Sequence, residues 1–190
     1  MSGPRTPLPA ADLARTVVFA AFIAVLGIFP GFYVGTSGVP IVLQNAGPLL
    51  AGAVLGARRG AASVVLLLAL TAIGLPLLSG GAGIGPFLGP SGGFLLGWIL
   101  SALVVGLIVE RAARPRLPVL LAAGAAGLAA DYLIGVPFLG LYTGDLPAAA
   151  TQSLVFLPGD AAKVVTVALI AATLHRALPG RLAGSAKRAR

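Results

Sequence analysis

Long apolar stretches recur along this chain, and each has the length that a helix needs to cross a hydrocarbon core about 30 Å thick. Hydrophobic residues make up 58% of the sequence and charged residues only 9%, as expected of a chain of 190 residues whose solvent is lipid. Six stretches can be delimited: residues 13–33, 39–55, 61–78, 92–109, 117–141 and 155–174. The sequence therefore predicts an all-α integral membrane protein, a bundle of six transmembrane helices in the lipid bilayer.

Basic residues occupy only some of the junctions between these stretches. Arg58 and Arg59 lie between the second and third stretches, and three arginines lie between the fourth and fifth. The other basic residues fall at the start of the first stretch or after the last, and of 13 Lys and Arg residues only Lys163 lies elsewhere. Because basic loops stay in the cytoplasm, we expect both termini to be cytoplasmic and the number of crossings to be even. The net charge of +8 then reflects topology and not nucleic-acid binding.

The connections on the opposite side have an unusual composition. Residues 36–44, 79–93 and 143–158 are rich in Gly, Pro and small polar residues, and Asp145 is their single charge. Such segments are too apolar for solvated loops and too interrupted for helix, so we expect them to fold back as external lid loops over a pocket. Residues 1–178 are predicted to form one membrane domain, followed by a basic, disordered tail over residues 179–190.

Asp160 and Lys163 stand three residues apart at the start of the sixth stretch, on one face of a helix. An ion in hydrocarbon costs at least ~2.5–3.5 kcal/mol, so their presence indicates a role. The pair is expected about one turn below the outer surface, where a small polar group could reach both side chains. We favour ligand contact; the alternative is an internal ion pair that only holds this helix in the bundle.

Other polar residues lie where they could share the same ligand. Gln44 and Asn45 place two carboxamides at the outer start of the second stretch, where they either cap a helix or bind polar atoms of a ligand. Asp131, near the middle of the fifth stretch, is compatible with a structural role and with a functional one. The candidate ligand-binding residues are Gln44, Asn45, Ser91, Tyr132, Asp160 and Lys163.

The chain offers little material for catalysis. It has no cysteine and one histidine, so disulfides, thiolate metal sites and cysteine nucleophiles are excluded, and we expect no metal, cofactor or catalytic residue. Residues 89–92 match the pattern around the serine of rhomboid-type intramembrane proteases. His175, however, lies about 25 Å from Ser91 at 1.5 Å per helical residue, whereas a general base must lie within ~3 Å of its nucleophile. The chain is predicted not to be an enzyme, and an intramembrane serine protease is a remote alternative.

Several motifs, in order and at matching spacing, resemble the BioY family of biotin transporters. They are VPIVLQ at 39–44, LLAGAVLGARRG at 49–60, GLP at 74–76, GPSGGF at 89–94 and LPGDAAK at 157–163. The resemblance implies a multi-pass protein of the prokaryotic cell membrane that binds biotin from outside, as the S component of an energy-coupling factor (ECF) transporter. Asp160 would accept the ureido N–H bonds and Lys163 would bind either the ureido carbonyl or the valerate carboxylate. An S component for another vitamin, such as thiamine or a folate, is the nearest alternative.

The resemblance also implies partners, namely a transmembrane coupling protein and two cytoplasmic ATPase subunits. Ala20 and Ala24 look like the family's small-residue patch that meets the coupling protein. Whether the ATPase module is required is left open by the sequence. The chain departs from the family pattern at Val42, where a threonine is frequent, and at Asp131, where an apolar residue is expected.

Overall fold

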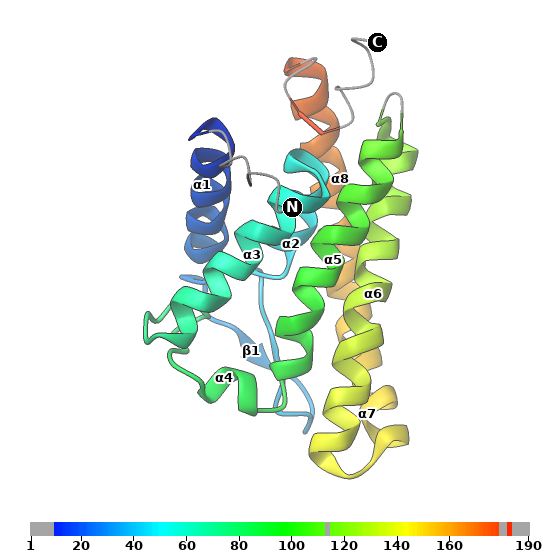
Figure 1. Cartoon of the computed structure of the whole chain (residues 1–190). Helices are drawn as coiled ribbons and strands as arrows, with labels where there is room; N and C mark the ends of the chain where they lie inside the picture. Colours follow the sequence, from blue (N-terminus) through cyan, green and yellow to red (C-terminus); the bar gives the residue numbers. More distant parts are fainter. Residues whose placement is uncertain (1–9, 113–114, 179–181, 184–190) are drawn as a thin grey trace, which may run out of the picture.

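The computed structural model describes residues 10–112, 115–178 and 182–183, which form a bundle of helices (Figure 1). The longer helices are α1 (Ala10–Leu26), α2 (Ala46–Leu55), α3 (Ala57–Ala72), α5 (Gly92–Arg111), α6 (Leu117–Thr143) and α8 (Leu157–Ala177). Shorter elements are α4 (Gly85–Leu88), α7 (Leu146–Ser153), a 3-10 turn (Leu154–Phe156) and two antiparallel strands, β1 (Phe32–Tyr33) and β2 (Pro40–Ile41). The predicted tail, residues 179–190, lies outside the described residues except for Leu182 and Ala183.

Three helical stretches within the described residues are long and apolar enough to cross a membrane. They are α5, α6 and the continuous stretch Leu146–Ala177, which joins α7 to α8. α2 is a shorter apolar helix of 10 residues. The chain is therefore mostly helical and has the helices of a membrane protein, as predicted.

Several segments differ from the predicted boundaries. The first apolar stretch was expected to reach residue 33, but α1 ends at Leu26, and the third was expected to reach residue 78, but α3 ends at Ala72. The second apolar stretch was expected to be helical from residue 39, but its first part pairs with residues 32–33 as β2, and helix begins only at Ala46. The third predicted lid loop, residues 143–158, is largely helical. Asp145 begins α7 by accepting a 2.9 Å hydrogen bond from the N–H of Ala148, and a proline in the first turn is compatible with a helix start. The Gly and Pro residues of this segment mark helix ends and not a loop.

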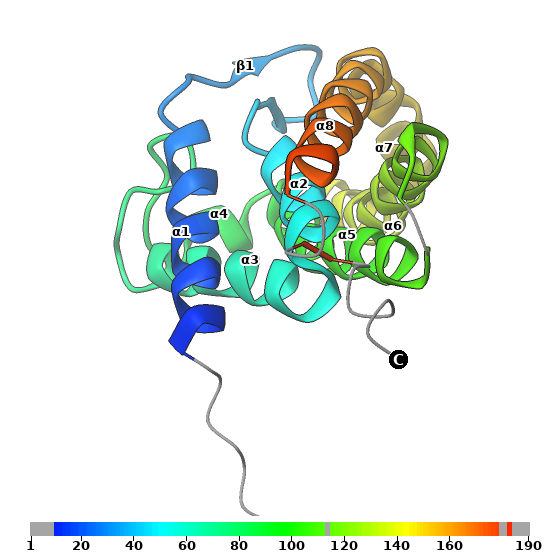
Figure 2. The same cartoon turned by 90° about the horizontal axis from the view of Figure 1, so that it is seen from above.

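The helices pack around α5, which lies against α2, α3 and, along most of its length, α6 (Figures 1 and 2). α8 packs on α6 and α2, and α1 lies at the edge of the bundle against α3. Small residues allow the close approach, as expected from the sequence: a Cβ on Gly52 of α2 would collide with the carbonyl oxygen of Ala102 on α5. Close backbone packing thus fixes the relative positions of the helices that carry the candidate residues.

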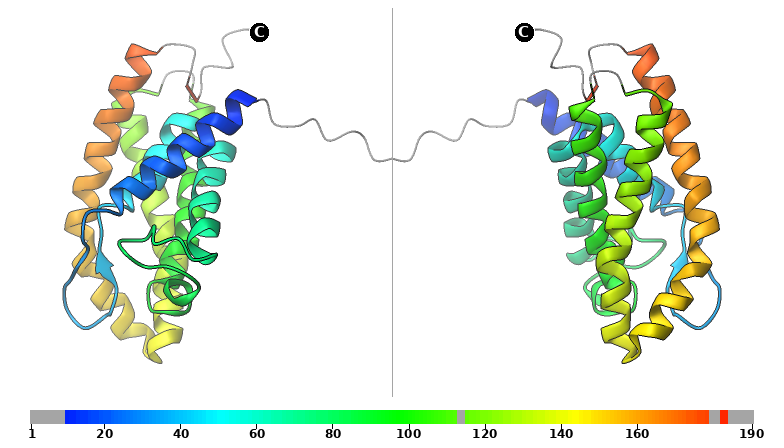
Figure 3. Two further views of the ribbon diagram at one scale, coloured as in Figure 1. Left: turned by 90° about the vertical axis from the view of Figure 1, so that its left-hand side faces the viewer. Right: turned by 90° about the vertical axis from the view of Figure 1, so that its right-hand side faces the viewer.

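The two ends of the bundle differ in composition. One end of the bundle holds the start of α1, the joint between α2 and α3, the end of α5, the start of α6 and the end of α8 (Figures 1 and 3). These are the places where the basic residues of the described chain gather, such as Arg58 and Arg59 at the start of α3 and Arg111 at the end of α5. The irregular segments 27–45 and 73–91 lie at the opposite end, where they help to line a cavity.

Candidate ligand-binding site

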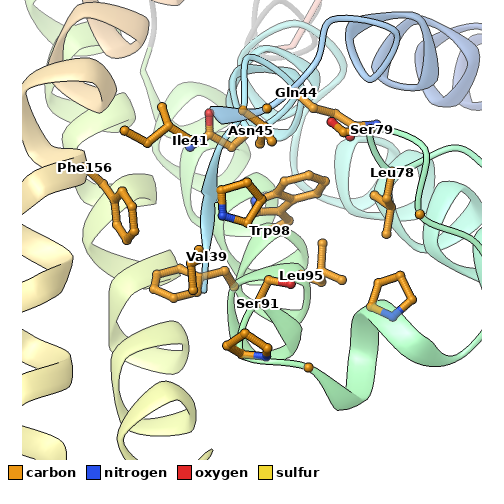
Figure 4. A pocket seen from close by; sticks show the side chains of 18 of the residues that line it. Val39, Ile41, Gln44, Asn45, Leu78, Ser79, Ser91, Leu95, Trp98 and Phe156 are labelled. Carbon is orange, nitrogen blue, oxygen red and sulfur yellow. The ribbon is translucent and has the colours of Figure 1, made fainter. Parts of the chain in front are cut away.

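A cavity of about 460 Å³ lies among α5, α6, the start of α8 and the irregular segments 27–45 and 73–91. Pockets for small molecules typically occupy about 300–1,000 Å³ and are mostly apolar with a few polar groups. Figure 4 shows Trp98 and Leu95 of α5 facing this space, with Ile41 and Phe156 on one side and Leu78 on another. The cavity therefore has the size and the walls of a small-molecule site.

Asp160, on the first turn of α8, is the centre of the polar part of the cavity. Its Oδ1 accepts a 2.9 Å hydrogen bond from Nδ2 of Asn45 and a 3.0 Å bond from Nζ of Lys163, and its Oδ2 accepts a 2.7 Å bond from the hydroxyl of Tyr132. The residue is only 4% exposed. Donors from three positions, 45, 132 and 163, therefore hold the carboxylate in a fixed orientation and offset the cost of burying its charge.

The structure brings together all the candidate ligand-binding residues. Gln44, Asn45, Ser91, Tyr132, Asp160 and Lys163 all line the one cavity. Asp160 and Lys163 lie on a single helix face, as their spacing predicted, and they form an ion pair with each other, which is the contact that the alternative interpretation requires. Asn45 stands just before α2 without capping it through its side chain.

Gln44 has a structural role that the sequence did not predict. It is 1% exposed, and its Nε2 donates to the carbonyl oxygens of Ile23 at 3.0 Å and Leu77 at 2.7 Å. The amide thus joins the end of α1 to the segment that follows α3. Both hydrogen bonds of the Gln44 amide nitrogen therefore stabilise the cavity wall.

Aromatic side chains position Tyr132 and were missed in the sequence. The ring of Phe94 packs edge-on against Tyr132 at 5.9 Å and against Phe156 at 6.3 Å between ring centroids. Phe94 and Trp98 are four residues apart and so share one face of α5. This spacing, together with the single tryptophan of the chain, was the signal that could have identified the apolar wall.

Some polar atoms around the cavity have no hydrogen-bond partner among the residues described. They include Oδ1 of Asn45, Oγ of Ser79 and Oδ1 of Asp131, all of them buried. Asp131 lies on α6 next to Tyr132 and is 5% exposed. Buried polar atoms are normally paired, so these groups are candidates for contact with a ligand or water.

The residues of the protease alternative do not meet. Ser91 lines the cavity at the start of α5, whereas His175 lies in the last turn of α8. Nε2 of His175 is 3.0 Å from the carbonyl oxygen of Ala53, near the end of α2. The two residues therefore do not form the dyad of the protease alternative, as the helix lengths predicted.

The predicted partner patch on α1 is mostly turned inwards. Ala20 is buried at 4% exposure, and Ala24 is partly buried against the core that includes Ile23 and Trp98. The outward face of α1 is formed by larger apolar residues, among them Val17 and Val18. In this conformation the two alanines fit α1 closely to the chain's own bundle.

Known proteins resemble this chain along nearly its whole length. Residues 3–180 match the BioY family. The biotin transporter BioY of Rhodobacter capsulatus is 47% identical over 180 residues, which cover 87% of this chain and 93% of the relative. The probable biotin transporter BioY of Bacillus subtilis is 35% identical over 170 residues, covering 88% and 91%.

The fold is also shared with a solved structure. A crystal structure of the S-component for biotin from an ECF-type ABC transporter matches with a TM-score of 0.81 at 31% sequence identity, and the match covers 90% of this chain and 95% of that one. These similarities confirm the resemblance first seen in the sequence motifs. The chain belongs to the BioY family.

Proposed function

We propose that this chain captures biotin in the cavity and serves as the substrate-binding subunit for biotin uptake by an ECF-type transporter. The observation that carries the proposal is the buried network of Asn45, Tyr132, Asp160 and Lys163 in an apolar cavity of about 460 Å³. BioY relatives are named biotin transporters, and the solved neighbour is an S-component for biotin. These relatives are transporters and not enzymes, which confirms the prediction that this chain is not an enzyme.

The chemistry of the cavity suits the parts of biotin. The thioether ring and aliphatic tail are apolar and would lie against side chains such as Trp98 and Phe156. The ureido group has two N–H donors and one carbonyl acceptor, and the valerate carboxylate is charged. Lys163 would donate either to the ureido carbonyl or to the carboxylate, and charge-assisted bonds of this kind are strong in a dry pocket. Gln44 and Ser91 also line the cavity, where they would contact the remaining polar atoms of biotin.

The membrane arrangement in this proposal has six crossings, with both termini in the cytoplasm of a prokaryotic cell and the cavity facing outwards. Support comes from the three long apolar helical stretches and from the gathering of basic residues at the end of the bundle opposite the cavity. Basic residues favour the cytoplasmic side. Cysteine scanning with impermeant maleimide tests this topology: Arg58→Cys should be labelled only from inside and Leu88→Cys only from outside.

The proposed partners are a transmembrane coupling protein and two cytoplasmic ATPase subunits. The support is the solved neighbour, which belongs to an ECF-type ABC transporter. Contact through Ala20 and Ala24 would require α1 to present a face that is mostly covered in this conformation. Uptake of labelled biotin would be measured in two hosts deficient in biotin uptake, one that expresses this chain alone and one that also expresses the coupling protein and ATPase subunits. Equal uptake in both would show that these subunits are not required.

Direct binding tests the proposed function. Purified protein in lipid nanodiscs would be titrated calorimetrically with biotin, thiamine and folate, and only biotin should bind tightly. Asp160→Asn should weaken binding strongly, because it removes the charge that orients Lys163. Asp145→Asn is the matched control, since Asp145 is exposed at the start of α7 and does not line the cavity. Tight binding of thiamine or folate in place of biotin would contradict the proposal.

A further inference from the structure

Asp131 is the second carboxyl group of the cavity, and the proposed function gives it no role. It projects from α6 and is 5% exposed, and its Oδ1 has no hydrogen-bond partner within the described chain. No ion pair found among the described residues includes it. A buried carboxyl oxygen normally has a hydrogen-bond donor, and the described part of the chain supplies none to this one.

The other polar side chains of the cavity direct their donors elsewhere. Lys163, Asn45 and Tyr132 all donate to Asp160, so this carboxylate has its partners before any ligand enters. The amide nitrogen of Gln44 donates to two backbone carbonyls. Asp160 thus has its hydrogen-bond donors within the protein, whereas Oδ1 of Asp131 has no partner among the residues described. A ligand with N–H donors would gain more binding free energy from a hydrogen bond to Asp131 than from one to Asp160.

The neighbouring helix leaves room for the carboxyl group. Gly97 of α5 faces Asp131, and a Cβ at Gly97 would collide with Oδ1 of Asp131 and come within 2.8 Å of its backbone carbonyl oxygen. Trp98, the next residue, lines the cavity. The glycine allows α5 and α6 to approach closely with an acidic side chain between them, at the edge of the ligand space.

We propose that Asp131 is a ligand-binding residue that accepts a hydrogen bond from a ureido N–H of biotin. The inference rests on the proposed function and deepens it, because it assigns the N–H donors to a group other than Asp160. Asp160 then acts mainly by holding Lys163, Asn45 and Tyr132 in place for the rest of the ligand. Oδ1 of Asp131, which has no partner within the described residues, becomes paired when the ligand binds.

Two substitutions separate ligand contact from a role in stability. Asp131→Leu keeps a similar volume without polar atoms, and we expect it to weaken biotin binding about ten- to a hundred-fold. Asp131→Asn keeps one acceptor oxygen and should weaken binding less. The ligand-free leucine variant should melt at the same temperature as the wild type or higher, because an unpaired buried polar group has been removed. Asp145→Asn again serves as the control outside the cavity.

A modified ligand identifies the bond itself. Biotin methylated on one ureido nitrogen, each nitrogen in turn, lacks one N–H donor. For the nitrogen that meets Asp131, methylation should cost less affinity in Asp131→Leu than in the wild type, whereas equal losses in both proteins for both analogues would overturn the inference. Wild-type affinity in Asp131→Leu would also overturn it and would leave the proposed function standing. A wild-type protein that binds no biotin would instead overturn the proposed function itself.

A purely structural role would give a different pattern. In that case Asp131→Asn and Asp131→Leu would lower the melting temperature of the ligand-free protein, while the folded Asn variant would bind biotin as tightly as the wild type. That combination would assign the carboxyl group to the packing of α5 on α6 and overturn the inference.

Discussion

The hydroxyl of Tyr132 donates a 2.7 Å hydrogen bond to Oδ2 of Asp160 and so links α6 to α8 at the wall of the cavity. The tyrosine ring is itself held by edge-on packing against Phe94 of α5. Side chains of α5 and α6 therefore contribute to the orientation of one buried carboxylate on α8. This relationship connects the packing of the bundle to the geometry of the proposed binding site.

Replacing Tyr132 by Phe would keep the ring and remove the donor. A hydrogen bond to a charged group is worth about 1.5–3 kcal/mol, and we expect biotin affinity to fall about ten-fold or more because Asp160 is less firmly oriented. Calorimetric titration would measure the change. Tyr142→Phe, at an exposed position of the same helix, should bind as the wild type does. Equal affinities in the two variants would contradict this role of the hydroxyl.

Lys163→Met would leave Asp160 without its cation. The two side chains are 12% and 5% exposed, and removal of one partner from a buried ion pair typically costs about 3–5 kcal/mol. We therefore expect a lower free energy of unfolding, measured in detergent with denaturant. Adding Asp160→Asn should restore much of the stability, since no unpaired charge remains, but should not restore binding. A double variant no more stable than Lys163→Met would show that the unpaired charge of Asp160 did not cause the loss of stability.

Gly97→Ala would force α5 and α6 apart, because the new methyl group would meet both the side chain and the backbone of Asp131. Overpacking of this kind costs about 1–3 kcal/mol. The melting temperature should fall, and biotin affinity should fall with it. Gly159→Ala is the matched control: nothing lies within 4 Å of a Cβ there, and a helical alanine adds at most about 1 kcal/mol of stability. A similar melting temperature in both variants would contradict the predicted collision.

Gln44→Leu would remove the donors that join Ile23 and Leu77. The carbonyl groups of Ile23, which is buried, and of Leu77, which is partly buried, would lose their partner, at a cost of about 1–3 kcal/mol. We expect faster hydrogen exchange at the end of α1 and in residues 73–84, measured by mass spectrometry. Gln152→Leu makes the same change on α7, away from the cavity, and should leave these two regions unaffected. Unchanged exchange after Gln44→Leu would mean that the segments are held by other contacts.

Much of the site could be predicted because charges are rare in an apolar chain. The cost of burying Asp160 and Lys163 identified the pair, and helical spacing placed them on one face. Sequence spacing could not reveal that Asn45 meets Asp160, since 115 residues separate them. Nor could it show which way Asp131 points, because a position in the middle of a helix does not define its neighbours.

The fold was predicted well where hydropathy and helix coincide, as in α5 and α6. Prediction failed where an apolar segment is not a regular helix. Residues 39–43 are apolar, yet Pro40 and Ile41 pair as a strand with residues 32–33. Conversely, Pro147 lies in the first turn of a helix in a segment that was predicted to be a loop. The hydropathy of a segment indicates whether it lies in lipid or in water, whereas its backbone conformation depends on helix capping and strand pairing.

The order of these residues along the chain has a consequence for biosynthesis. Asn45 is translated before Asp160 and Lys163, which belong to α8, the last helix among the described residues. A nascent chain that has not yet inserted this helix contains neither the acid nor its cation. Such a chain lacks the pair on which the proposed binding depends, so a product truncated before α8 would compete for insertion into the membrane but not for the vitamin.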